Sequence, residues 1–313
     1  MLTLERIDEG SALVRGRGSH RASCSTEEAE IAPRIHIASE PFFWSLRLLP
    51  APRRKAMHAL YAFRREVGGI AEGEASRTLK LALLADWRDQ IALLYAGRPQ
   101  HVVTRALRDA IDRFDLRCDD FLAIIDGIKM DARADIRAPS QEQLDLYCEQ
   151  TAVAVGRIAL RIFGVAPPDS ERLAAALGHG MQLTGILRDL AQDAARHRLY
   201  PPRELLHAHR IFATIPGYVL AQPALPQVCN ALAERAVAHF ADAERAIADR
   251  PRWAMLAVTA MLASYRTLLE GLLAREWARL DQPVRMPAWR QTALLIGHGL
   301  EPAKYLSLRE AWL

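Results

Sequence analysis

Residues 181–193 read MQLTGILRDLAQD, and they lie within a long and nearly uninterrupted helical segment, 169–196. Asp189 and Asp193 are four residues apart, so on a helix their carboxylates project from the same face, one turn apart. The stretch therefore predicts a long helix that presents a pair of carboxylates.

Helical segments also follow one another outside this stretch, from Pro41 onward, and no run alternates apolar and polar residues as a strand does. Gly97 and Gly164 are each followed closely by proline, a pattern typical of a helix end. Ser140 and Gln143 fit a capping box. We expect helices over 41–73 with a break at Pro50 and Pro52, 76–96, 101–114, 119–133, 140–163, 203–209, 225–249 and 251–280, with a shorter one near the C-terminus.

The composition also favours helix, because alanine, leucine, arginine and glutamate abound while valine and isoleucine are few. Residues 1–38 differ from the rest: they are polar and rich in serine, arginine and glutamate. We predict an all-α protein with a flexible N-terminal arm over 1–38 and one multi-helix domain over 39–313. A chain of 313 residues is long enough to bury a sizeable core.

Composition excludes several classes of function. The four cysteines include no CxxC pair, which argues against a disulfide framework or a zinc site and favours the cytoplasm. We find no signal peptide and no stretch approaching the roughly 20 apolar residues of a membrane span. A net charge of +4 without a concentrated basic face argues against nucleic-acid binding. That charge is consistent with a protein that handles diphosphates or makes peripheral contact with anionic lipid.

The carboxylate pair has two interpretations. Like charges one turn apart repel and destabilise an isolated helix by a few tenths of a kcal/mol, whereas a bound Mg²⁺ reverses that sign. Alternatively, Asp189 and Asp193 are surface acids paired with nearby arginines. Their neighbourhood favours the metal site, because a polar run lies in a segment otherwise apolar enough to be buried, and buried charges must be paired or coordinated. That run comprises Gln182, Arg188, Asp189, Asp193, Arg198 and Tyr200.

Four blocks of sequence resemble the squalene/phytoene synthase family. Residues 181–206, MQLTGILRDLAQDAARHRLYPPRELL, are similar to the second aspartate-rich signature of these enzymes. Residues 42–67, FFWSLRLLPAPRRKAMHALYAFRREV, resemble the region that leads into the first such motif. GIKMDARADIRAP at 127–139 and DLYCEQTAVAVGRIALRIFG at 145–164 also match, in the family's order. DWRDQIALLYAGRP and DFLAIIDG look closest to bacterial presqualene diphosphate synthases of hopanoid biosynthesis.

The resemblance implies an isoprenoid-synthase-type domain in which two aspartate-rich helices face each other across a central cavity and hold Mg²⁺. The implied reaction joins two farnesyl diphosphates head to head to presqualene diphosphate, which makes the chain a prenyl transferase. The alternatives are a phytoene synthase that uses geranylgeranyl diphosphate and a catalytically degenerate member that acts as a binding or assembly protein. Downstream isoprenoid enzymes are the partners that it implies.

The resemblance also assigns roles to individual residues. For each arginine or tyrosine that receives a role below, the alternative interpretation is a structural salt bridge or hydrogen bond. Phe43, Met57, Leu60, Val155 and Leu183 are better interpreted as core residues. The implied metal ligands are Asp189, Asp193 and Glu72; the implied catalytic residues are Tyr61, Tyr147 and Arg188; the implied substrate-binding residues are Arg47, Arg65, Gln182, Arg198 and Tyr200.

The chain departs from the family at the first aspartate-rich motif. Where the family has D-D-x-x-D-E, residues 68–73 read GGIAEG, so that only Glu72 keeps a carboxylate. A glycine inside a helix costs about 1 kcal/mol relative to alanine, so this pair also weakens the helix there. Three hypotheses follow: a working but weaker metal cluster, binding of prenyl diphosphate without efficient turnover, or an assembly role. We favour the first, since the second motif is intact.

Overall fold

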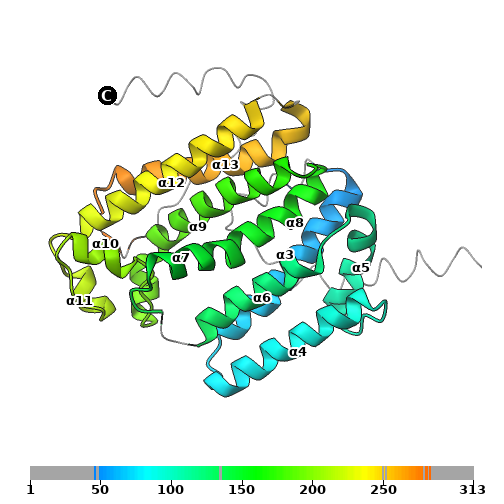
Figure 1. The fold of residues 1–313 in the computed structure, drawn as a ribbon, viewed down its shortest axis with the longest axis horizontal. Helices are drawn as coiled ribbons and strands as arrows, with labels where there is room; N and C mark the ends of the chain where they lie inside the picture. Colours follow the sequence, from blue (N-terminus) through cyan, green and yellow to red (C-terminus); the bar gives the residue numbers. More distant parts are fainter. Residues whose placement is uncertain are drawn as a thin grey trace, which may run out of the picture.

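The computed structural model describes residues 46, 49–133, 136–248, 250, 252–277, 279, 280 and 282. Within them the chain is helical and contains no strand; a single parallel bridge joins Arg137 to Leu199. The predicted all-α class is therefore confirmed (Figure 1). The expected N-terminal arm, Phe43, Arg47 and the expected short C-terminal helix lie outside the described residues.

Most helices begin and end close to the expected positions, but the helix expected over 251–280 ends at Leu273 and a turn follows it. They are α3 (Ala51–Glu72), α4 (Arg77–Tyr95), α5 (Val102–Phe114), α6 (Cys118–Ala132), α7 (Gln141–Cys148), η2 (Glu149–Val153), α8 (Ala154–Phe163), α9 (Asp169–Ala195), α10 (Arg203–Ala208), α11 (Pro216–Leu220), α12 (Leu225–Ala248) and α13 (Arg252–Leu273). Two features were not expected. The helix predicted over 140–163 contains a π-helical turn, η2, and the short α11 follows Ile215.

Local sequence explains where two of these helices begin and end. The Ser140 side chain accepts from the Gln143 amide while the Gln143 side chain accepts from the Ser140 amide, which confirms the predicted capping box at α7. Gly164 ends α8 in the left-handed region, at φ 86°, which only glycine adopts without strain.

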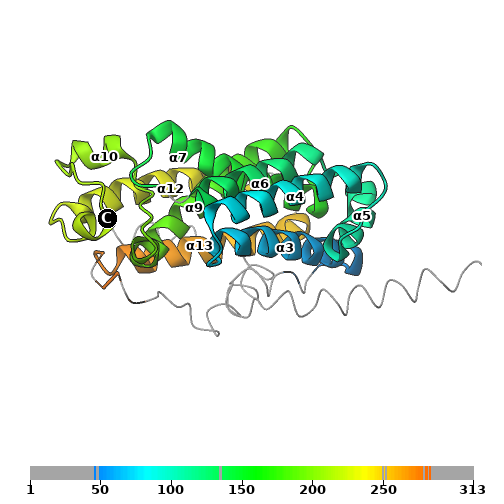
Figure 2. The ribbon, with the colours of Figure 1, turned by 90° about the horizontal axis from the view of Figure 1, so that it is seen from below.

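The long helix α9 lies at the centre of the packing. It contacts α8, η2, α12 and α13, while α3 packs against α4, α5, α6 and α8 (Figure 1). Seen from below, α3 and α13 lie on one side of the molecule and α4, α6 and α7 on the other (Figure 2). Met57, Leu60 and Leu183 are each 1% exposed, which confirms them as core, and Val155 is partly buried against that core.

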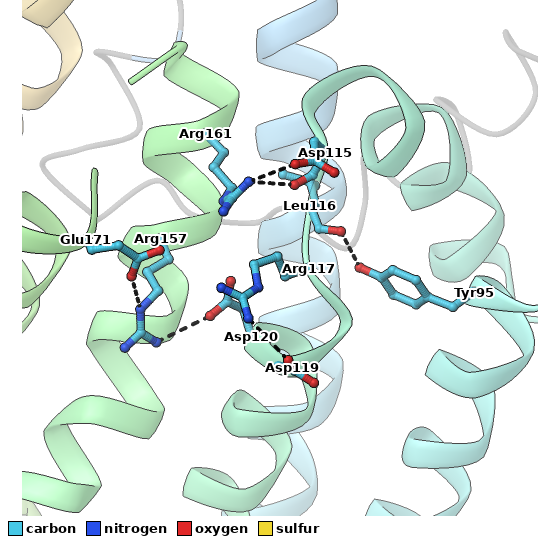
Figure 3. Close-up of polar contacts among 9 residues, drawn as sticks. All are labelled: Tyr95, Asp115, Leu116, Arg117, Asp119, Asp120, Arg157, Arg161 and Glu171. Atoms are coloured by element: carbon cyan, nitrogen blue, oxygen red, sulfur yellow. Dashed lines mark hydrogen bonds and ion pairs between the residues drawn. The ribbon is translucent and has the colours of Figure 1, made fainter. Parts of the chain in front are cut away.

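A charged hub ties four of these elements together at one end. Arg157 of α8 donates to Asp120 of α6 at 3.3 Å and to Glu171 of α9 at 2.8 Å (Figure 3). It also pairs with Glu149 of η2. Burial raises the pKa of Asp120, which Arg157 opposes. Because one cation meets three carboxylates, removing it would leave buried charge unpaired. The hub therefore fixes how α8 and α9 pack.

One expectation from composition was wrong. Met255–Leu273, within α13, is long and apolar enough to cross a membrane by length and composition alone. About half of that stretch is buried (50%), and α13 packs against α9 and α12. The core helix of a globular domain passes the same test, so this stretch is weak evidence for a span.

Candidate active site

Asp189 and Asp193 are on one face of α9, as predicted, and both are half-buried. Burial and the neighbouring Asp189 raise the pKa of Asp193 to about 7, against the opposing influence of Arg198. A carboxylate with so high a pKa lacks sufficient counter-charge. The pair therefore fits a divalent cation, because Mg²⁺ is commonly held by one or two carboxylates together with substrate phosphate oxygens and water.

Arg188 contacts this pair directly. Its Nε donates to Asp189 Oδ1 at 2.8 Å and its Nη2 to Asp189 Oδ2 at 2.6 Å, which makes the contact a two-pronged ion pair. The structure thus shows Arg188 in a structural salt bridge, which was the alternative to its predicted catalytic role. Contact between Arg188 and a diphosphate stays a prediction.

Tyr147 and Tyr200 converge on a carboxylate that the sequence analysis did not select, Asp131 of α6. The Tyr147 hydroxyl donates to Asp131 Oδ2 at 3.0 Å and the Tyr200 hydroxyl donates to Oδ1 at 2.6 Å. The two rings stack with centroids 5.0 Å apart. Burial raises the pKa of Asp131 and of both tyrosines, so the tyrosines are neutral donors. These three residues form one buried network.

Arg198 connects this network to the carboxylate pair and to α3. Its Nη2 donates to the Ala71 carbonyl at 3.3 Å, and its charge lowers the pKa of both Asp131 and Asp193. The backbone holds it in place, since the Leu199 amide donates to the Ile136 carbonyl at 2.7 Å. The segment that follows α9 is thereby fixed beside the segment that follows α6.

Helix α3 contributes fewer carboxylates to the site than α9 does. Tyr61, Arg65, Gly68 and Glu72 share one face by their spacing, and α3 continues through the glycine pair to Glu72. Tyr61 is half-buried, Arg65 is exposed, and both make contacts. Glu72 is exposed, although its charge reaches Asp131 and raises that pKa.

No three histidine, cysteine or carboxylate side chains of the described chain come close enough together to hold a metal. Glu72 therefore does not join Asp189 and Asp193 in a preformed cluster, and its role as a ligand stays a prediction. Gln182, half-buried on α9 and seven residues before Asp189, shares the face of the pair. Arg47, a predicted substrate contact, lies outside the described residues.

A pocket of about 350 Å³ lies against the two tyrosines. Tyr147 and Tyr200 line it together with Arg77, Arg133, Arg137 and Arg203, four arginines that the sequence analysis did not select. Neither Asp189 nor Asp193 is among its lining residues.

The family model described as squalene/phytoene synthase matches residues 35–290. The chain belongs to this family. A presqualene diphosphate synthase from Rhodopseudomonas palustris is 43% identical over 277 residues, which cover 85% of this chain and 99% of that protein. A phytoene synthase from Arthrospira platensis is 28% identical over 272 residues, covering 82% and 87% of the two chains.

A solved structure confirms the fold of this synthase family member. The crystal structure of a dehydrosqualene synthase with ligand superposes with a TM-score of 0.79, covers 91% of this chain and 98% of its own, and is 24% identical. The family, the helical fold class and the enzyme class predicted from the sequence are therefore confirmed: the chain is a prenyl transferase of the squalene/phytoene synthase type.

Proposed function

We propose that this synthase condenses two farnesyl diphosphates head to head to presqualene diphosphate, on the route to squalene and hopanoids. The higher identity to a presqualene diphosphate synthase than to a phytoene synthase supports this product over one made from geranylgeranyl diphosphate. The observation that carries the proposal is the half-buried pair on α9, in which Asp193 has a pKa of about 7.

In the proposed reaction the C–O bond of one substrate breaks and its diphosphate leaves with the bonding electrons. The double bond of the second chain attacks the allylic cation, and one proton is lost as the cyclopropane ring closes. Mg²⁺ held by Asp189, Asp193 and the substrate would neutralise charge on the departing diphosphate. Arg198, and Arg188 when it releases Asp189, would orient phosphate oxygens through guanidinium hydrogen bonds.

The buried network has a positioning role in this scheme. Both tyrosine hydroxyls donate to Asp131, so the carboxylate stays satisfied and oriented away from bulk water. Its negative charge in turn holds Arg198 beside Asp193. Gln182, Arg65, Tyr61 and Arg47 are the further substrate contacts that we propose, from their match to the family.

The first test is product analysis with farnesyl diphosphate, with and without Mg²⁺. A cyclopropyl C30 diphosphate identified by mass spectrometry, formed only with the metal, is the expected result. A C40 product from geranylgeranyl diphosphate at higher efficiency would instead favour the phytoene synthase alternative.

The glycine pair supplies a second, sharper test. A Cβ at Gly68 or Gly69 would meet no atom within 4 Å, so Gly68→Asp/Gly69→Asp fits without distortion and restores two carboxylates on α3. We expect the native chain to be active and the double variant to turn over faster by up to about tenfold, at a lower Mg²⁺ requirement. Thr78→Asp, an exposed site on α4, controls for added charge.

A different outcome would identify a degenerate member. If the native chain forms no product where Gly68→Asp/Gly69→Asp does, the enzyme proposal fails and an assembly role, with other isoprenoid enzymes as partners, takes its place. Equal rates for the two chains would show that the carboxylates of α3 are dispensable.

We also propose a cytoplasmic enzyme in peripheral contact with membrane. Phe212, Ile215 and Tyr218, which are 71%, 54% and 65% exposed, lie between α10 and the end of α11, close to Arg210. Large apolar side chains beside a cation suit the interface of an anionic bilayer, into which a C30 product must pass.

Vesicle co-sedimentation tests this contact. Phe212→Ser/Tyr218→Ser should lower the fraction bound to phosphatidylglycerol vesicles by about fivefold or more. Val237→Ser, at an apolar position of α12 that is 50% exposed, should leave binding unchanged. Equal loss from both variants would refute a specific contact surface.

A further inference from the structure

Four arginines line the pocket beside Tyr147 and Tyr200, whereas the carboxylates of Asp189 and Asp193 do not line it. Arg77 begins α4, Arg133 and Arg137 lie in the segment between α6 and α7, and Arg203 begins α10, so three parts of the chain bring arginines to one pocket. All four arginines are exposed, so solvent partly screens their mutual repulsion, and an anion bound in the pocket would remove what remains of it.

The arginines are poorly compensated by the protein itself. Within the described part of the chain, neither Arg77 nor Arg133 forms an ion pair or a side-chain hydrogen bond. Among the described residues, the Arg137 side chain donates to the His197 carbonyl alone, at 3.4 Å. Arg203 pairs with Glu204 at 3.6 Å, but both side chains are 54% exposed, and such a surface pair is weak.

The position of the pocket relates it to the missing motif. Arg77 comes five residues after Glu72, the only acid left in the first motif. The stacked Tyr147 and Tyr200, which line the pocket, both donate to Asp131. A charged group bound in this pocket therefore lies next to the buried network, and Arg77 brings it close in sequence to the α3 motif that lacks two carboxylates.

We propose that this arginine pocket binds a diphosphate group directly, without a metal ion, either as the terminal diphosphate of a prenyl substrate or as released inorganic diphosphate. The inference rests on the proposed function for its ligand. Guanidinium groups match phosphate oxygens in geometry and charge, and several forks around one cavity suit a group with two phosphorus centres. In this chain, arginines at one subsite take over the charge neutralisation that metal-bound aspartates would supply.

Equilibrium binding in the presence of EDTA tests the proposal independently of turnover. Inorganic diphosphate and farnesyl thiodiphosphate, titrated calorimetrically at low ionic strength, are the two probes. Removing each guanidinium should weaken binding about tenfold, so Arg77→Gln/Arg133→Gln should weaken it by about 100-fold. Arg113→Gln, which removes an exposed arginine of α5 away from the pocket, should leave affinity unchanged.

The two probes distinguish the source of the ligand. Arginine-dependent binding of both assigns the pocket to the substrate headgroup, and binding of inorganic diphosphate alone assigns it to the released product. Metal-free binding that is absent, or that is equal in the double variant and in Arg113→Gln, overturns the proposal.

A further comparison separates this inference from the proposed function. Metal-free affinity should be the same in Asp193→Asn as in the native chain, and thermal unfolding should show all variants folded. If the product assay fails while arginine-dependent binding persists, only the proposed reaction falls.

Discussion

Replacing Asp189 or Asp193 by alanine should lower turnover of farnesyl diphosphate by about 1,000-fold or more at saturating Mg²⁺. Each substitution removes one of two carboxylates available on α9 to a cation, and the described residues contain no group of three potential ligands that could hold the metal instead. Losing one charge at a site that stabilises a departing diphosphate typically costs several kcal/mol of transition-state stabilisation. Steady-state kinetics over a range of Mg²⁺ concentrations would measure the loss.

Removing the charge of Asp193 should lower activity but raise the free energy of unfolding. Asp193 has a pKa of about 7 in the folded chain against an ordinary value of 3.8, so keeping it ionised opposes folding. The favourable contribution of the protonated form is complete below about pH 4 and is lost as pH rises through 7. In EDTA at pH 8, Asp193→Asn should therefore raise the free energy of unfolding by on the order of 1 kcal/mol, with a smaller gain at pH 5 and none below pH 4.

Measuring both properties on Asp193→Asn, which also lacks the carboxylate charge, excludes a trivial explanation, because a variant that loses activity while gaining stability has not simply unfolded. Gln192→Ala is the matched control, since Gln192 is exposed on the same helix beside Asp193. It should change neither the rate nor the Mg²⁺ dependence. Full activity in both aspartate variants would refute the site on α9.

Patterns that are local in sequence predicted most of the fold. The capping box at Ser140 and the left-handed Gly164 are encoded within a few residues, and both occur where expected. Spacing alone placed Asp189 and Asp193 on one face of α9. Helix boundaries depend on backbone hydrogen bonds to near neighbours, so the sequence carries that information directly.

Features that depend on contacts between distant segments were missed. Asp131 was quoted within a matching block but not selected, because its role appears only when Tyr147 and Tyr200, 16 and 69 residues away, donate to it. The arginine pocket gathers three parts of the chain, so no single stretch of sequence predicts it. The π-helical turn was missed for a similar reason: its sequence, EQTAV, suits an ordinary α-helix, and its packing against α9 distinguishes it.

That packing leads to the largest expected effect on stability. A Cβ at Gly178 of α9 would lie 2.7 Å from the backbone nitrogen and Cα of Val153 in η2. Backbone atoms cannot move aside cheaply as the end of a flexible side chain can, so Gly178→Ala must push the two elements apart. We expect it to lower the free energy of unfolding by about 3 kcal/mol, measured by urea denaturation.

Gly185 provides the control within the same helix. A Cβ there would meet no atom within 4 Å, so Gly185→Ala should gain helix propensity and stabilise the chain by up to about 1 kcal/mol. Two chemically identical substitutions, seven residues apart, should therefore change stability in opposite directions. Equal effects would show that α9 and η2 can separate without penalty. Since Tyr147 precedes η2 and Asp189 follows Gly178 on α9, the close crossing at Gly178 also sets how the buried network and the carboxylate pair lie relative to each other.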